Sequence, residues 1–503
     1  MYIKNVYIKN YRNFKEINVP LYPYTTIIGD NDVGKTNFFD AIKLLLNNNS
    51  IQFYSKRLAL TDINSWTVSE FRTKILGDLA RLKENIDNEI NQLNNIAMNI
   101  GVNTAVIKDW NKKIRDSLIT YSTDKFIHQF ETQIRNEIIK KSIKNPKFWG
   151  YKSIDNDSYG LNMSADTNYT RSLPLDKIEK QFKNSKLMEN CICFNSGMAA
   201  LNAVITICQK IINVPVYAYS AYFETYSLLK EITIKNKMFE NKDAYLNAFA
   251  DSNLHLVEMP VCSTERQDLS INEIKTGILN SKKEVFILII DSTLELENKQ
   301  KIKSLLNINK NLIVFKVRSG LKLDQFGLEL ANLGIVEVYS NLSSKHIEFI
   351  VNMLKNYRAV SGLSIDYNSY LRLIAPILTA KDKVLYKQKI KSNTSKLFEI
   401  ISQKKNKYFK VKFKFGLPFI FLIPTCPNFK LVNWVDDLVK EVNDKGGYLP
   451  YGTSFGFRHT RLEIIDDRKK QPYLRLAPGA FLGKSNNILL QYLENKICEK
   501  YAK

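Results

Sequence analysis

The sequence lacks a long uninterrupted apolar segment. No run in its 503 residues approaches the roughly 20 consecutive apolar residues that a membrane-spanning helix needs. The N-terminus also lacks the basic-then-apolar order of a secretion signal. These two absences predict a cytoplasmic protein.

Cysteine is scarce, with six residues scattered over the whole length. Such scattered cysteines do not form the framework of a disulfide-stabilised protein. The pair Cys191 and Cys193 has no second pair that would complete a zinc site. The sequence therefore predicts neither a disulfide scaffold nor a structural metal.

Acidic residues are outnumbered, 50 against 73 lysines and arginines, which gives a net charge of +23. A basic surface can bind nucleic acid by releasing counterions from phosphates. The lysines are spread widely, however, and the clusters at residues 140–147, 381–396 and 404–414 form no recognisable nucleic-acid module. Nucleic acid is therefore a secondary expectation. The length predicts two or three domains.

The first 48 residues contain a phosphate-binding loop. Strand-like segments at residues 2–11, 16–19 and 24–28 precede the run Gly-Asp-Asn-Asp-Val-Gly-Lys-Thr at residues 29–36, and a helical pattern follows. In such a loop, backbone N–H groups hold phosphates, the lysine reaches the outer ones and the hydroxyl holds Mg²⁺. The predicted nucleotide-binding residues are Gly29, Asn31, Gly34, Lys35 and Thr36, with Thr36 as the Mg²⁺ ligand.

This segment resembles the N-terminal edge of RecF, SMC and OLD-type ATPases. Those proteins begin with an Ile-x-Asn-Tyr-Arg-x-Phe strand like residues 8–14, and the resemblance covers about 48 residues. The family also needs a strand ending in Asp-Glu for hydrolysis, whereas the best candidate here ends in Asp291 and Ser292. The resemblance implies ATP binding more than turnover.

Residues 50–145 have a polar, helical pattern. Apolar residues fall on one stripe at Phe71, Ile75, Leu79, Leu82, Ile86 and Ile90, and a break at residues 101–103 precedes a second helical pair. We expect an extended helical hairpin that joins two domains.

After residue 146, apolar strands alternate with amphipathic helices, which predicts a doubly wound α/β domain. The apolar segment 311–315 reads as a buried strand, and Ser319 and Lys322 follow its end. Open α/β sheets place their chemistry at this edge. A lysine among apolar neighbours there has a lowered pKa, so its neutral amine can form a Schiff base with a carbonyl.

Five short runs then follow in a distinctive order. They are Tyr169-Thr170-Arg171, Asn195-Ser196-Gly197-Met198-Ala199-Ala200, Ala221-Tyr222-Phe223-Glu224-Thr225, Asp291-Ser292-Thr293 and Ser319-Gly320-Leu321-Lys322. Their order and spacing resemble the Cys/Met-metabolism family of pyridoxal-phosphate (PLP) enzymes, over residues 150–500.

The resemblance assigns a role to each run. Lys322 is the implied catalytic Schiff-base lysine, and Arg475 is the implied ligand of the substrate α-carboxylate. Asp291 pairs with the pyridine nitrogen, and Tyr222 stacks on the ring. The implied phosphate ligands are Ser196, Gly197, Met198 and Ser319, with Tyr169 and Arg171 reaching the phosphate of a neighbouring subunit in a homodimer or higher homo-oligomer.

The sequence departs from this family around the implied substrate pocket. Leucines stand at positions 321 and 323, where the family has threonine and tyrosine, and Glu224 places a carboxylate near the implied ring site. The groups that hold the cofactor are kept, whereas the walls of the substrate pocket differ. The resemblance therefore predicts PLP binding more firmly than a particular lyase reaction.

Together these patterns predict an α/β protein of the PLP-dependent transferase fold type I. The predicted parts are a P-loop segment (1–48), a helical insert (49–145), a large PLP-binding domain (146–380) and a small C-terminal α+β domain (381–503). The predicted activity is Cβ or Cγ elimination or replacement on an amino acid or amino-acid conjugate, with ATP binding as a regulator. The alternative is an OLD/RecF-like phage-defence or DNA-associated protein with a PLP-like effector domain.

Overall fold

The computed structural model describes thirteen stretches of the chain. They are residues 5–11, 14–20, 68–120, 123–143, 175–182, 190–232, 235–281, 283–296, 301–373, 380–404, 406–452, 456–466 and 471–502. The strand predicted at 24–28, the nucleotide-binding residues Gly29, Asn31, Gly34, Lys35 and Thr36, and the pair Tyr169 and Arg171 lie outside them.

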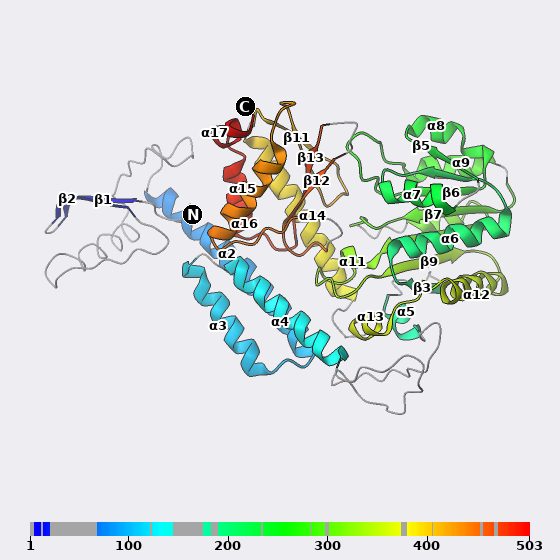
Figure 1. The fold of residues 1–503 in the computed structure, drawn as a ribbon, viewed down its shortest axis with the longest axis horizontal. Coiled ribbons are helices and arrows are strands. Elements are labelled where there is room, and N and C mark those ends of the chain that lie inside the picture. Colours follow the sequence, from blue (N-terminus) through cyan, green and yellow to red (C-terminus); the bar gives the residue numbers. More distant parts are fainter. Residues whose placement is uncertain are drawn as a thin grey trace.

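The chain begins with a two-stranded antiparallel hairpin. Strand β1 (Asn5–Tyr11) pairs with β2 (Phe14–Pro20), with Val6 opposite Val19 (Figure 1). This confirms the first two strands predicted from the sequence.

Three helices follow, α2 (Val68–Asn99), α3 (Thr104–Thr120) and α4 (Thr123–Ile143). The predicted break between α2 and α3 is confirmed, and Gly101 there has a φ of 71°, a conformation that glycine adopts without strain. Ile86 and Ile90 of the predicted stripe are buried.

The helices differ from the expected extended hairpin, because they share a hydrophobic core with later parts of the chain. Besides α2, helix α4 has a buried stripe of its own, Ile127, Phe130, Ile134 and Ile138. This stripe packs in one cluster with residues from 323–330, 417–421 and 477–481. A second apolar stripe needs a partner surface, so the helices pack into the body of the protein (Figure 1).

The central part of the chain forms a seven-stranded sheet in the order β3-β9-β8-β7-β6-β4-β5. The strands are β3 (Asn190–Phe194), β4 (Val216–Tyr219), β5 (Asn236–Phe239), β6 (Leu254–Glu258), β7 (Phe286–Asp291), β8 (Leu312–Ser319) and β9 (Gly334–Ser340). Strand β9 runs antiparallel to both of its neighbours, and the pairs from β8 to β5 are parallel.

Helices cover both faces of this sheet. In β7, Ile287 and Ile289 face the cluster that includes α6 (Gly197–Ile212) and α12 (Ser344–Val360), with α7 (Phe223–Ile232) beside α6. Phe286 and Leu288 face the opposite cluster, with α5 (Asp176–Phe182), α8 (Lys242–Asn247), α9 (Ile271–Ser281), α10 (Lys301–Leu306) and α13 (Tyr367–Leu373). Strands buried on both faces explain the continuous apolar runs, and the predicted α/β class is confirmed.

Helix α14 (Ala380–Gln403) leads from this region to a second, antiparallel sheet (Figure 1). Its strands are β10 (Phe409–Phe413), β11 (Ile420–Pro424), β12 (Arg461–Ile465) and β13 (Tyr473–Ala477), in the order β10-β11-β13-β12. Helix α15 (Leu431–Asp444) buries Trp434 and Leu438 against it. Apolar patterns in the sequence predict strands at 410–415 and 419–423 and a helix at 432–442, and the structure confirms all three, whereas β12 was not predicted.

The sequence pattern predicts one closing helix that ends at Tyr501, but in the structure this helix is interrupted. It consists of α16 (Lys484–Tyr492), α17 (Asn495–Cys498) and a 3₁₀ turn (Glu499–Tyr501). The Asn406 side chain donates to the Leu493 carbonyl, and the Asn495 side chain accepts from the Lys407 N–H. These contacts hold the junction between the helices. The domain boundaries at 48, 145 and 380 stay predictions. Among the described residues, no helix is both long and apolar enough to cross a bilayer.

The shared core predicts that the helical insert contributes to the stability of the whole body. Ile134 is fully buried in α4, so we expect Ile134→Ala to destabilise the protein by about 2–5 kcal/mol, through lost burial and a cavity. Thermal unfolding followed by circular dichroism measures this. The control is Met98→Ala, because Met98 is 51% exposed on α2. Equal melting temperatures for both variants would contradict the shared core.

Candidate functional site

The predicted site residues gather where the parallel strands end. Glu258 ends β6 and lies opposite Asp291 at the end of β7, while Ser319 ends β8. Helix α11 (Gly320–Leu323), which carries Lys322, begins directly after β8. The carboxyl edge of an open α/β sheet is where such folds place their ligands.

Two of the predicted phosphate-binding runs meet at this edge. Helix α6 begins at Gly197, and a Cβ atom added there would lie 3.0 Å from the Ser319 Cβ. The close approach therefore favours glycine, because a side chain here would require Ser319 to shift. The Ser196 hydroxyl accepts from the Ala199 N–H at 3.1 Å, so this side chain caps the helix. The first N–H groups of α6, beside Ser319, form a cradle suited to an anion.

Thr293 connects this cradle to Asp291. Its hydroxyl accepts from the Ser319 N–H at 3.0 Å, and its own N–H donates to Asp291 Oδ1, also at 3.0 Å. The sequence analysis included Thr293 in the Asp-Ser-Thr run but gave it no role. It fixes the distance between the cradle and the carboxylate.

Two carboxyl groups lie side by side in this site. Burial raises the pKa of Asp291, and burial together with the charge of Asp291 raises the pKa of Glu258 to about 7. Glu258 accepts hydrogen bonds from the Ser220 hydroxyl at 3.0 Å and from the N–H groups of Ala221 and Cys262 at 2.7 and 3.0 Å. Glu258 was not predicted from the sequence, although an acidic residue at the end of an apolar strand is a recognisable signal.

Tyr222 lies in the turn that Glu258 holds. Burial, with a hydrogen bond to Glu224, raises the pKa of its phenol, and the charges of Asp291 and Arg475 also act on it. The structure thus brings Tyr222 near Asp291 and Arg475, two other residues of the predicted site. Met198, in contrast, packs against the core on one face of the sheet.

Lys322 has the lowered pKa that the sequence analysis anticipated. Burial and the positive charge of Arg475 lower the pKa of its ammonium to about 8, against the opposing charges of Glu463, Cys262 and Glu329. A free lysine side chain has a pKa of about 10.4, so the neutral amine is far more populated here near pH 8. A neutral amine can act as a nucleophile or a base.

Arg475 is already engaged by a carboxylate of the chain. Its Nε donates to Glu463 Oε2 at 2.8 Å, Nη2 donates to the same oxygen, and Nη1 lies 3.2 Å from the Cys262 Sγ. Its guanidinium also lies 4.5 Å from the centre of the Phe419 ring. The implied ligand of a substrate carboxylate thus shares its donors with Glu463. Glu463 stands opposite Arg475 between β12 and β13, and was missed because β12 was not predicted.

The electrostatic coupling between Arg475 and Lys322 can be measured. Removing the arginine cation in Arg475→Gln is expected to raise the pKa of Lys322 above about 8, since that cation favours the neutral amine. Competitive acylation at a series of pH values, with the Lys322 peptide quantified by mass spectrometry, gives the midpoint. The control is Arg115→Gln, a surface position on α3. An unchanged midpoint in Arg475→Gln would disprove the coupling.

Three of the solved structures that are similar to this chain are enzymes. A methionine gamma lyase from Micromonospora echinospora is 12% identical, with 72% of this chain and 97% of that chain covered at a TM-score of 0.48. A serine palmitoyltransferase from Sphingomonas wittichii is 13% identical over 73% and 84%, at 0.49. An aminotransferase from Anaerococcus prevotii is 15% identical over 67% and 83%, at 0.44.

Two sequence comparisons match an endonuclease and an ATPase domain. The endonuclease GajA of Bacillus cereus is 48% identical over 46 residues, which are 9% of this chain and 8% of that protein. The model of the AAA ATPase domain matches residues 1–418, most of the 503. This extent shows that the chain belongs to the AAA ATPase domain family.

Proposed function

We propose that residues 190–480 form a PLP-binding site that acts on an amino acid or an amino-acid conjugate. One observation carries the proposal: the low-pKa amine of Lys322, the cradle at Gly197 and Ser319, and the buried carboxylate of Asp291 are brought to one edge of the sheet. An aldehyde-bearing, phosphorylated cofactor with a basic ring nitrogen needs these three kinds of group.

The cradle fits the phosphate of this cofactor. N–H groups at the start of α6 and the Ser319 hydroxyl would hold the phosphate oxygens, and the positive end of the helix dipole would favour their charge. The Ser196 hydroxyl supports this site indirectly, because it caps the helix.

The carboxyl groups of Asp291 and Glu258 are suited to a site for the pyridine nitrogen of the cofactor. Neither Asp291 nor Glu258 forms an ion pair with a described residue, and burial disfavours the charged form of both. A protonated pyridine nitrogen beside Asp291 would supply the missing cation. Glu258 would position Tyr222 and the turn around it through its bonds to Ser220 and Ala221.

PLP, when bound, supplies an electron sink for the charge left at the Cα of an amino acid. Lys322, as a neutral amine, would take the Cα proton and return it to the product. Arg475 would orient the α-carboxylate, provided that the substrate shares or displaces Glu463. The reaction class we propose is elimination or replacement at Cβ or Cγ. The proposed assembly is a homodimer, in which Tyr169 and Arg171 would reach the cofactor phosphate of the neighbouring subunit.

Absorbance spectroscopy tests this proposal. We expect the protein, supplied with PLP, to develop a yellow band that borohydride removes, with the cofactor then covalently attached to Lys322. Lys322→Ala should lose the attachment completely, while Lys310→Ala, at an exposed lysine just before β8, should retain it. Peptide mapping of the reduced protein identifies the attachment point. Two results would overturn the proposal. One is a wild-type protein that takes up no PLP, and the other is a Lys322→Ala variant that is labelled as strongly as the wild type.

A second candidate function is favoured by the family match and the similarity to an endonuclease. We propose ATP binding at Lys35 and Thr36, with Mg²⁺, as a regulator of the Lys322 site or as the activity of a defence or DNA-associated protein. A physical route exists in the described residues. Helix α2, which follows the N-terminal segment, carries Glu89, and Glu89 bonds to Arg458 behind the turn that follows Lys322.

The two candidates are separated by a binding experiment. If ATP regulates the Lys322 site, ATP should change the dissociation constant of PLP by about fivefold or more, the usual range of allosteric coupling. Lys35→Ala should abolish the change without altering PLP affinity in the absence of ATP, and Lys43→Ala serves as the control in the same segment. A PLP dissociation constant that is the same with and without ATP would refute regulation. A protein that binds ATP but not PLP would have only the nucleotide-dependent function.

A further inference from the structure

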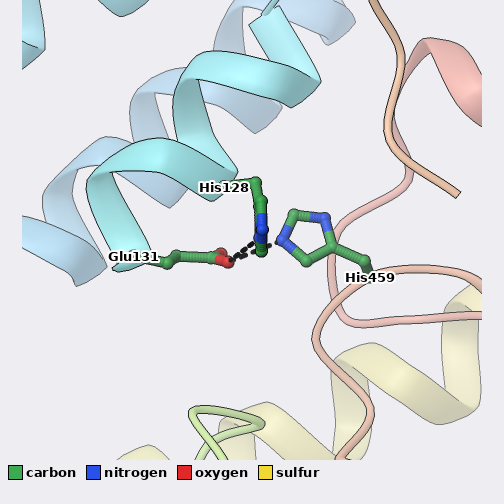
Figure 2. A group of neighbouring side chains, drawn as sticks. All are labelled: His128, Glu131 and His459. Carbon is green, nitrogen blue, oxygen red and sulfur yellow. Dashed lines mark hydrogen bonds and ion pairs between the residues drawn. The ribbon is translucent and has the colours of Figure 1, made fainter. Parts of the chain in front are cut away.

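We propose that His128, Glu131 and His459 form a binding site for a divalent transition-metal ion of the zinc type. The three side chains meet between α4 and the segment that precedes β12 (Figure 2). One ligand atom from each lies within 4.8 Å of the others. Two imidazoles and a carboxylate are a ligand set that zinc binds, with its fourth position left for water or another ligand.

The spacing on α4 creates half of this site. His128 and Glu131 stand at positions i and i+3, so they lie on one face of the helix. His459 comes from a segment 328 residues later than Glu131 and completes the triangle. The sequence analysis missed the site because only the fold brings these residues together.

The distances around Glu131 suit a small cation. His459 Nε2 lies 2.7 Å from Glu131 Oε2, and His128 Nδ1 lies 3.6 Å from the same oxygen. Ligands bound to zinc at about 2.0–2.1 Å in tetrahedral geometry are separated by roughly 3.3 Å. A small outward shift of His459 and a small inward shift of His128 would therefore admit the ion.

The environment of His128 is independent evidence for a bound ligand. Its Nδ1 atom is buried and has no hydrogen-bond partner among the described residues, since 3.6 Å is longer than a hydrogen bond. The ring is held in place by stacking on Tyr448, with the ring centres 3.7 Å apart. A buried, oriented nitrogen without a hydrogen bond is costly unless something binds it, and its contact with Glu131 is too long to be one.

The surroundings hold the carboxylate for monodentate binding. Arg458 Nε donates to the other oxygen of Glu131, Oε1, at 2.6 Å. The positive charge of Arg458 is in turn balanced by Glu89. Glu131 thus keeps one oxygen for an ion, and its negative charge is not cancelled by Arg458 alone. Such supporting partners fix the direction of metal ligands.

Zinc alone is the probe for the test. Untagged full-length protein, stripped with chelator and titrated with Zn²⁺, is expected to bind one ion per chain, and its melting temperature should rise. His128→Phe keeps the aromatic stacking but removes the ligand, and His459→Gln keeps a donor to Glu131. Both variants should lose the bound ion and the thermal shift. The control is His346→Ala, at an exposed histidine on α12 that should leave both unchanged.

Cobalt distinguishes this site from the cysteines. Co²⁺ in a site of two histidines and a glutamate should show ligand-field bands without thiolate charge-transfer absorption. Retention of stoichiometric zinc in His128→Phe, a thiolate band, or no stoichiometric binding to a folded wild-type protein would each overturn the proposal. The measurement on the wild-type protein decides the matter even if a variant fails to fold.

Discussion

The contact of helices α2 and α4 with the rest of the protein depends on a buried cation, the guanidinium of Arg458. It lies between Glu89 of α2 and Glu131 of α4, and all three side chains are almost completely buried. Burial opposes ionisation of Glu131, but His459 and Arg458 outweigh it and hold its pKa well below the ordinary value. Removing one member would leave an uncompensated buried charge, which typically costs about 3–5 kcal/mol. The two helices are therefore bound to the C-terminal part by charge as well as by apolar packing.

The same arginine also supports the turn behind Lys322. Its guanidinium lies 4.8 Å from the centre of the Phe326 ring, and a Cβ atom at Gly327 would collide with Arg458. Phe326 and Glu329 have φ values of 58° and 51°, which side chains rarely adopt without support. Arg135 of α4 donates to the Leu328 carbonyl at 2.7 Å. The helical insert thus stabilises a strained turn that begins four residues after the proposed catalytic amine.

Local patterns allowed much of the fold to be predicted, but the charges that organise it were not visible in them. The apolar runs ending at Asp291 and Ser319 predicted strands, because strands buried on both faces need continuous apolar residues. Glu463 was missed because its strand has a weak apolar pattern and its role depends on pairing with Arg475. Glu131 and His459 were missed for a related reason. They lie hundreds of residues apart in the chain, and a contact over such a distance leaves no pattern in the local sequence.

The family match and the site chemistry differ in how much of the chain they involve. The family match begins at residue 1 and continues through the seven-stranded sheet, whereas the amine, the anion cradle and the paired acids all lie at one edge of that sheet. Helix α2 follows the N-terminal segment in the chain and carries Glu89. From α2, the contact of Glu89 with Arg458 leads to the Phe326 turn and so to Lys322. This network of buried contacts therefore connects the helical insert with the turn that follows Lys322.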